Sequence, residues 1–124
     1  MLFRLDFQSA VPIYRQIRDQ VVLAVAQGEL TPGERLPTTR ALAEDAGVNV
    51  MTVSKAYQLL KAEGYLATNR RAGAVVCAPR GKAAGLSADQ TARLNLLAGE
   101  ARLAGLTLED FLAACKAAFG ETED

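Results

Sequence analysis

At 124 residues, half of them apolar, the chain is long enough to form one small domain, with or without an appendage. It has no run of about 18 apolar residues, so we expect no contact with a membrane, and its charged first residues argue against a secretory signal. Because neither feature is present, we expect a cytoplasmic location. The chain also contains no histidine, the commonest general base and metal ligand, so we expect neither an enzyme nor a metal or cofactor site.

The net charge of zero conceals two halves of opposite sign. Residues 1–80 carry ten basic and seven acidic side chains, a net charge of +3, whereas residues 81–124 carry four basic and seven acidic ones, a net charge of −3. The front half is therefore suited to face an anion, and the tail is not.

Patterns typical of catalysis or of metal binding are absent from the sequence. It contains no paired-carboxylate site and no phosphate-cradling glycine loop. The two cysteines, Cys77 and Cys115, are far apart and have no CxxC partner. We therefore expect two buried free thiols rather than a disulfide or a metal site.

In chain order, the first predicted elements are an N-terminal segment, a helix and a loop. Residues 2–10 alternate loosely and predict a short strand or an arm. Its apolar residues are expected to cover the domain or a partner: Phe3, Leu5 and Phe7. Pro12 suits the start of a helix, and apolar residues recur at helical spacing from Ile13 to Ala24. Gly28 ends this helix, and "TPGERLP" predicts a loop after it.

Two further helices are predicted on either side of a tight turn. A short helix over Thr38–Ala46 begins at a threonine cap and stops at Gly47. The next helix, Asn49–Glu63, has an asparagine cap at its start, and Gly64 lies just past its end. Two helices joined by a short glycine-containing turn form a helix-turn-helix.

A hairpin and a two-helix tail complete the prediction. "YLAT" and "AVVCA" have strand character on either side of the basic tip "NRRAG", and a helix-turn-helix followed by a basic hairpin is a winged helix. "PRGKAAG" predicts a linker, so we divide the chain into a DNA-binding domain of residues 1–80 and a helical region of residues 81–124. Caps at Ser87 and Thr107 begin helices that run to about Ala104 and Phe119. The predicted fold class is mainly α with a small β-hairpin.

The helix over residues 49–63 has an unusually polar first turn. Its apolar stripe is formed by Val53, Ala56, Tyr57 and Leu60, and its outward face carries polar residues in the first two turns. A helix that enters the major groove of DNA uses mostly its N-terminal turns, where Asn, Thr, Ser and Lys meet bases or phosphates. The alternative is that Asn49 and Thr52 form a capping pair and that Lys55 is a solvated charge.

Residues 12–79 resemble the DNA-binding domain of the GntR family of bacterial transcription regulators. The resemblance rests on "PIYRQI", "GELTPGERLPTTRALAEDAGVNVMTVSKAYQLLKAEGYL" and "RRAGAVV". The helix "NVMTVSKAYQLLKAEGYL" and the short two-helix tail resemble the YtrA subfamily in particular. "KAY" also occurs in the MocR subfamily, but this chain has no room for the large aminotransferase-like domain of those regulators. The resemblance implies a winged helix, a homodimer and a palindromic operator in double-stranded DNA.

By position, the resemblance also implies which residues contact DNA. They fall before and in the second helix, in the recognition helix and in the wing: Arg35, Thr38 and Arg40; Asn49, Val50, Met51, Thr52 and Ser54; Arg71 and Gly73. The outward face and the basic tip themselves add Lys55 and Arg70. The arginine at position 40 matches a family residue that grips phosphate, and such a contact sets register and salt dependence without reading sequence.

The chain departs from the family at several of these positions. Many members have Arg where this chain has Val50 and Ser54, so operator sequences of other members do not transfer. One wing glycine is missing, and we expect Gly73 to approach the minor groove and Arg71 to contact the minor groove or a phosphate. The alternative is that Arg70 and Arg71 form a solvated hairpin tip.

The tail helices are apolar on more faces than one pair of helices can cover. The helix that begins at Ser87 has leucines on opposite sides, and the last helix has one broad apolar face. We expect a homodimer interface that includes Leu94, Leu97, Ala101, Leu108, Phe111, Leu112, Cys115 and Phe119. The alternative is that the tail folds back on its own winged helix.

The sequence therefore predicts a dimeric DNA-binding repressor. The YtrA resemblance implies control of genes for ABC-type transporters and of the regulator's own gene. No cluster of polar residues in the tail indicates a small-molecule effector. A winged-helix adaptor that binds another protein is the second hypothesis, and DNA affinity that falls steeply with salt separates the two.

Overall fold

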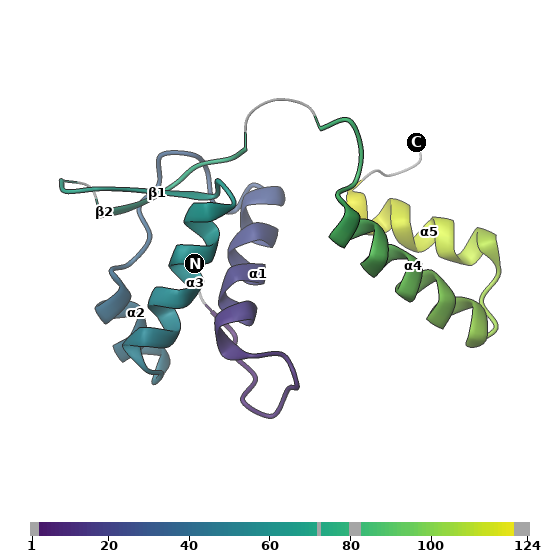
Figure 1. Ribbon diagram of the computed structural model, residues 1–124, viewed down its shortest axis with the longest axis horizontal. Coiled ribbons are helices and arrows are strands. Elements are labelled where there is room, and N and C mark those ends of the chain that lie inside the picture. Colours follow the sequence, from purple (N-terminus) through teal and green to yellow (C-terminus); the bar gives the residue numbers. More distant parts are fainter. Residues whose placement is uncertain (1–2, 72, 80–82, 121–124) are drawn as a thin grey trace. The chain divides into compact units, whose positions relative to one another are not determined.

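The computed structural model describes residues 3–71, 73–79 and 83–120. Within them lie five helices and one antiparallel pair of strands: α1 (Ile13–Ala26), α2 (Thr39–Ala46), α3 (Val50–Ala62), β1 (Leu66–Asn69), β2 (Gly73–Val76), α4 (Ala88–Leu103) and α5 (Leu108–Phe119) (Figure 1). The fold is mainly α with a small hairpin, as predicted. Its contacts divide into two compact units, residues 1–80 and 81–124. No helix in the described part of the chain is long and apolar enough to cross a membrane.

The first unit has one hydrophobic core. Helix α3 packs against α1 on one side and α2 on the other, and β1 covers its C-terminal end (Figure 1). The predicted stripe of α3 is buried, with Val53, Ala56 and Leu60 fully inaccessible to solvent and Tyr57 7% exposed. From α1, Ile17 and Val21 are also fully inaccessible. Burial of this kind contributes about 1.5–3 kcal/mol for each large apolar side chain.

The predicted caps define the helices of both units. The side chains of Thr38 and Asn49 accept hydrogen bonds from the first turns of α2 and α3. Ser87 and Thr107 each form a reciprocal capping box at the start of α4 and α5. Gly47, in the turn between α2 and α3, has a φ of 70°, which favours glycine. Local side-chain bonding therefore fixes where these helices begin.

The hairpin is part of a larger strand arrangement than predicted. β1 pairs with β2 from Leu66 opposite Val76 to Asn69 opposite Gly73. The other edge of β2 bonds the segment that we predicted as a plain loop: the amides of Gly33 and Leu36 donate to the carbonyls of Val76 and Ala74 at 2.8 and 2.9 Å. Residues 31–37 form no helix or strand, so the loop prediction is confirmed, and the isolated bridge between Arg35 and Val75 is an addition to it. These hydrogen bonds satisfy backbone amides and carbonyls of segments that lie about 40 residues apart in the sequence. Local sequence patterns do not reveal pairing over such a separation.

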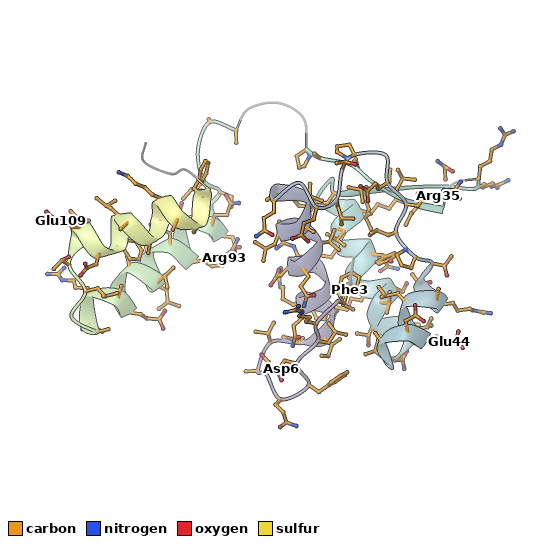
Figure 2. The ribbon with its side chains drawn as sticks, turned by 180° about the vertical axis from the view of Figure 1, so that it is seen from behind. Phe3, Asp6, Arg35, Glu44, Arg93 and Glu109 are labelled. Carbon is orange, nitrogen blue, oxygen red and sulfur yellow. The ribbon has the colours of Figure 1, made fainter. Side chains whose placement is uncertain are left out.

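The N-terminal segment is an arm and not a strand within the described residues. Two glutamines of α1 hold its backbone: Gln20 bonds both the amide and the carbonyl of Arg4, and Gln16 does the same at Asp6, with distances of 2.7–2.9 Å. Between these bonds Leu5 packs against the core, as does Phe3, which is labelled in Figure 2. The next apolar residue of the segment, Phe7, is 62% exposed and does not cover the core as the others do.

The second unit consists of α4 and α5, which contact each other. No described residue in either helix is buried. This corrects one expectation for the cysteines: both are free, as predicted, but Cys115 is exposed on α5 and Cys77 is only half-buried. The Cys77 thiol donates to the carbonyl of Gly64 at 3.2 Å. The predicted linker and domain boundary include residues 80–82, which lie outside the described residues.

Candidate nucleic-acid interface

The first two turns of α3 have one face that lies outside the core, and the structure places the predicted site residues of this helix on that face. Met51 is 72% exposed and Val50 is 38% exposed. Lys55 is exposed one turn further along, while Thr52 and Ser54 are half-buried on the flanks. Because the opposite face of the helix is packed into the core, these side chains are the ones that α3 can offer to a ligand.

Asn49 caps α3, so the capping interpretation is confirmed for this residue. Its side-chain oxygen accepts a hydrogen bond from the amide of Met51 at 2.7 Å. An amide side chain has a second lone pair on the oxygen and two N–H donors, so capping leaves groups that can reach a base edge. The cap holds the Asn49 side chain at the tip of the helix.

A shallow hollow of about 550 Å³ lies on the outward face of α3 and is bounded on one side by a residue of α1. It is lined by Tyr14, Met51, Thr52, Ser54, Lys55 and Gln58. The structure thus brings four predicted residues together and adds two that we did not assign to the site. The Lys55 ammonium lies 4.1 Å from the centre of the Tyr14 ring. Nothing in the local sequence indicates this contact, because it depends on how α1 packs against α3.

The residues around α2 form a second group. Thr38 caps α2 through a hydrogen bond from the amide of Ala41 at 3.1 Å, and Arg40 is exposed in the first turn. The Tyr57 hydroxyl donates to the carbonyl of Pro37 at 2.7 Å, which ties α3 to the residue just before this cap. Burial raises the pKa of Tyr57 to about 12, so the hydroxyl keeps its proton. The bond fixes the start of α2 against the recognition helix.

The wing carries the remaining predicted residues of the front unit. Arg70 and Arg71 are exposed at its tip, and the Arg71 amide donates to the side chain of Asn69 at 3.0 Å. Gly73 has a φ of 71°, and a Cβ there would meet no atom within 4 Å. The glycine is therefore required by the backbone conformation and not by crowding within the chain. Residue 72 of the predicted tip lies outside the described residues.

Arg35, predicted as a DNA contact in the segment before the second helix, is attached to the wing. It forms a β-bridge with Val75 on the free edge of β2, and its side chain is exposed (Figure 2). On the other strand, the Lys61 ammonium donates to the Thr68 hydroxyl at 2.9 Å and links α3 to β1. The bridge at Arg35 joins the wing to the segment before α2, and the bond from Lys61 joins it to the recognition helix.

A bidentate ion pair stabilises the far end of the recognition helix. The Arg18 guanidinium donates to both carboxylate oxygens of Glu63 at 2.9 and 2.8 Å. Its hydrogen bonds to Glu63 raise the pKa of Arg18 above its ordinary value, and Asp19 adds to this effect. Because Arg18 lies on α1 and Glu63 at the end of α3, the pair holds these helices in register.

The predicted interface residues of the tail differ in their exposure to solvent. Ala101 and Phe111 are half-buried between α4 and α5, and Leu108 joins them around a hollow of about 400 Å³. Leu108 itself is exposed, and so are the other five: Leu94, Leu97, Leu112, Cys115 and Phe119. Within the described residues, no group of three or more Cys, Asp or Glu side chains is arranged to hold a metal ion.

Comparison with known proteins gives the family. Residues 13–76 match the bacterial regulatory proteins of the gntR family. The chain is 36% identical over 107 residues to the HTH-type transcriptional regulator Rv1152 of Mycobacterium tuberculosis, covering 86% of this chain and 85% of that protein. It is 39% identical over 75 residues to the HTH-type transcriptional repressor YtrA of Bacillus subtilis, covering 60% of this chain and 58% of that protein.

Solved structures agree with this assignment. A transcriptional antiterminator from Listeria monocytogenes has a TM-score of 0.83 at 25% identity and covers all of this chain and 98% of its own. YtrA from Sulfolobus acidocaldarius, a GntR-family transcription factor, has a TM-score of 0.63 at 35% identity, over 82% of this chain and 99% of its own. The DNA-binding domain of AraR in complex with its operator ORX1 has a TM-score of 0.54 at 26% identity, over 60% of this chain and 96% of its own.

These matches include the helix-turn-helix, the wing and the recognition helix whose polar face lies outside the core. The relatives from Mycobacterium tuberculosis and Bacillus subtilis and the Sulfolobus structure are transcription regulators, and the AraR domain is bound to its operator. The chain belongs to the gntR family of bacterial regulatory proteins, as a YtrA-like member that binds DNA to regulate transcription.

Proposed function

We propose that the protein is a dimeric repressor that binds a palindromic operator in the cytoplasm and controls a transporter operon together with its own gene. The observation that carries the DNA-binding part is the outward face of α3, where Asn49 and Lys55 are exposed and Thr52 and Ser54 are half-buried, while the opposite face is packed into the core. The name of the YtrA repressor supports repression. The resemblance to the YtrA subfamily supports the choice of transporter genes.

In this proposal the residues of the interface divide by role. Asn49, Thr52 and Ser54 meet base edges in the major groove, and Met51 contacts a thymine methyl group. Arg40 and Lys55 grip phosphates, which sets the register and the salt dependence. The wing residues Arg70, Arg71 and Gly73 approach the minor groove or its phosphates. Arg35, which is bridged to β2, adds a further positive charge there.

The proposed dimer rests on the tail. In α4 and α5 most of the large apolar side chains are exposed, with Leu103 at 91% and Phe119 at 85%. A second copy would cover this surface and would also place two recognition helices on one DNA duplex. Two helices about one DNA turn apart read two half-sites of opposite direction, which is why a dimer implies a palindrome.

The test is fluorescence anisotropy with the region upstream of the protein's own gene, against random DNA of the same length, at two salt concentrations. We expect the upstream region to bind about 10³-fold more tightly than random DNA, and footprinting of it to reveal a dyad. Equal affinity for both DNAs would contradict sequence-specific regulation of this gene. Absence of binding to either DNA at low salt would favour the adaptor hypothesis.

The regulated genes require a second experiment. Deletion of the gene should raise the transcripts of a transporter operon and of the regulator's own promoter, measured by RNA sequencing. Lower transcript levels after deletion would identify an activator instead.

A further inference from the structure

The contact between Lys55 and Tyr14 joins the recognition helix to α1 at the exposed face. The Lys55 ammonium lies over the Tyr14 ring, 4.1 Å from its centre. Tyr14 is half-buried in the first turn of α1, and Lys55 is exposed. Both line the hollow that also contains Met51, Thr52 and Ser54. Helices α1 and α3 lie side by side (Figure 1), so the ring is a fixed surface beneath a flexible side chain.

Among the charged groups of the described residues, no carboxylate forms an ion pair with Lys55. The aromatic ring is the partner that the structure gives it. The negative face of an aromatic ring attracts an ammonium group, and a lysine has three N–H donors. The side of the ammonium that faces away from the ring therefore stays available for a phosphate oxygen.

A free lysine side chain loses much conformational freedom when it is fixed at an interface. A ring that already holds the ammonium reduces that loss, because the side chain is ordered before DNA arrives. Tyr14 itself packs against the core, and so does its neighbour Ile13. The ring is therefore a rigid support for the ammonium group.

We infer that Tyr14 is a positioning residue for DNA binding, which holds the Lys55 ammonium in the place where it meets a DNA phosphate. This inference rests on the proposed function, because it assigns a supporting residue to the same interface. Tyr14 acts through Lys55 and through the face of its ring, and its hydroxyl is not required.

The test is a double-mutant cycle with Tyr14→Leu and Lys55→Met, and with Tyr14→Phe as the matched control. The probes are the fluorescein-labelled upstream fragment and a random-sequence duplex of the same length. We expect Tyr14→Leu to weaken binding to both duplexes about two- to fivefold, and Tyr14→Phe to bind like the wild type. In the Lys55→Met background, Tyr14→Leu should have no further effect. Lys55→Met should also reduce the salt slope by about one.

Additive effects of Tyr14→Leu and Lys55→Met, or an equal loss for Tyr14→Phe, would overturn the inference. The cycle also separates this inference from the proposed function. Additive effects together with selective binding of the upstream fragment would remove the role of Tyr14 alone. A coupled cycle with equal affinity for both duplexes would remove sequence-specific regulation and leave the role of Tyr14 in place.

A measurement on the wild-type protein without DNA covers the case in which Tyr14→Leu does not fold. In its NMR spectrum, the ε-methylene protons of Lys55 should lie upfield of those of the other lysines, because they are above an aromatic ring. The shift should persist in Tyr14→Phe. Lys55 signals at the same position as the other lysines would overturn the inference.

Discussion

The two units of the chain are built from similar helices but differ in what they bury. In the first unit, α1, α2 and α3 enclose a core with the sheet, and residues such as Ile17 and Leu60 are completely inaccessible. In the second unit, α4 and α5 contact each other and bury no described residue fully. Both units have well-capped helices, so helix formation does not account for the difference.

A single pair of helices is too small to enclose a core. Within the first unit α3 is covered by α1, α2 and β1, whereas the described part of the second unit consists of one helix pair. The exposed apolar residues of the tail are consequently numerous: Leu94, Leu96, Leu97, Leu103, Leu106, Leu108, Leu112 and Phe119. The first unit therefore supports its own fold, and the second is suited to association.

The strongest test of this comparison introduces charges into the tail. Leu97→Glu combined with Leu112→Glu should dissociate the proposed dimer, because a buried unpaired carboxylate is costly at an interface. Analytical ultracentrifugation should then report a monomer, and affinity for the palindromic operator should fall about 10²- to 10⁴-fold as the two half-sites bind independently. Affinity for an isolated half-site should not change.

The control for this variant is Leu23→Glu. Leu23 is a leucine of α1 in the first unit and, at 56%, is as exposed as Leu97. It should leave both the dimer and operator binding intact. A dimer that survives the double substitution would place the association surface outside the tail.

The next largest effect is expected in the core of the first unit. Leu60→Ala should lower the free energy of unfolding by about 2–5 kcal/mol, because it opens a cavity where the side chain has no exposed surface. Leu23→Ala, the same change at an exposed position of that unit, should stay within about 0.5 kcal/mol of the wild type. Urea denaturation followed by circular dichroism measures both. Equal losses would show that Leu60 has no special place in the core.

Asn49→Ala tests whether the capped tip of α3 also reads bases. Affinity for the operator should fall by about 1–3 kcal/mol and affinity for random DNA should change little, as measured by fluorescence anisotropy. Arg40→Ala is the comparison variant: it should weaken binding to all DNA and reduce the salt slope by about one. Equal losses of Asn49→Ala on both DNAs would remove Asn49 from base reading.

This substitution also affects the helix itself. Asn49→Ala removes the hydrogen bond to the amide of Met51 and should cost about 1 kcal/mol of stability. Thermal unfolding of the variant therefore accompanies the binding assay. Thr38→Ala, which removes the corresponding bond to Ala41 at the start of α2, gives the cost of a lost cap elsewhere in the same unit.

The smallest effect concerns the buried tyrosine of the first unit. The pKa of Tyr57 is about 12 in the folded chain and 10.0 in its ordinary environment, so the folded chain retains a proton that the unfolded chain loses. This stabilisation is complete below pH 10 and is lost as the pH rises toward 12, at about 1 kcal/mol per pH unit. Urea denaturation should show a shallower decline for Tyr57→Phe in this range. Identical pH profiles would contradict the shifted pKa.

The sequence by itself determined the helices and the inward face of α3. Thr38, Asn49, Ser87 and Thr107 cap helices at the predicted positions, because a cap bonds to an amide only two or three residues away. The stripe of α3 was equally readable, since residues at helical spacing share one face wherever the helix is placed. The same residues supported the resemblance to the GntR family, and the predicted DNA contacts and dimer interface stay predictions.

Tertiary structure alone decided the contacts between distant segments. The pairing of residues 33–36 with β2, the arm held by Gln16 and Gln20, and the ring of Tyr14 under Lys55 each join elements that are far apart in sequence. The exposure of Cys115 was misjudged for the same reason, because a cysteine on an apolar face is buried only where another element covers it. Local patterns specify which face of an element is apolar, but packing decides what lies against it.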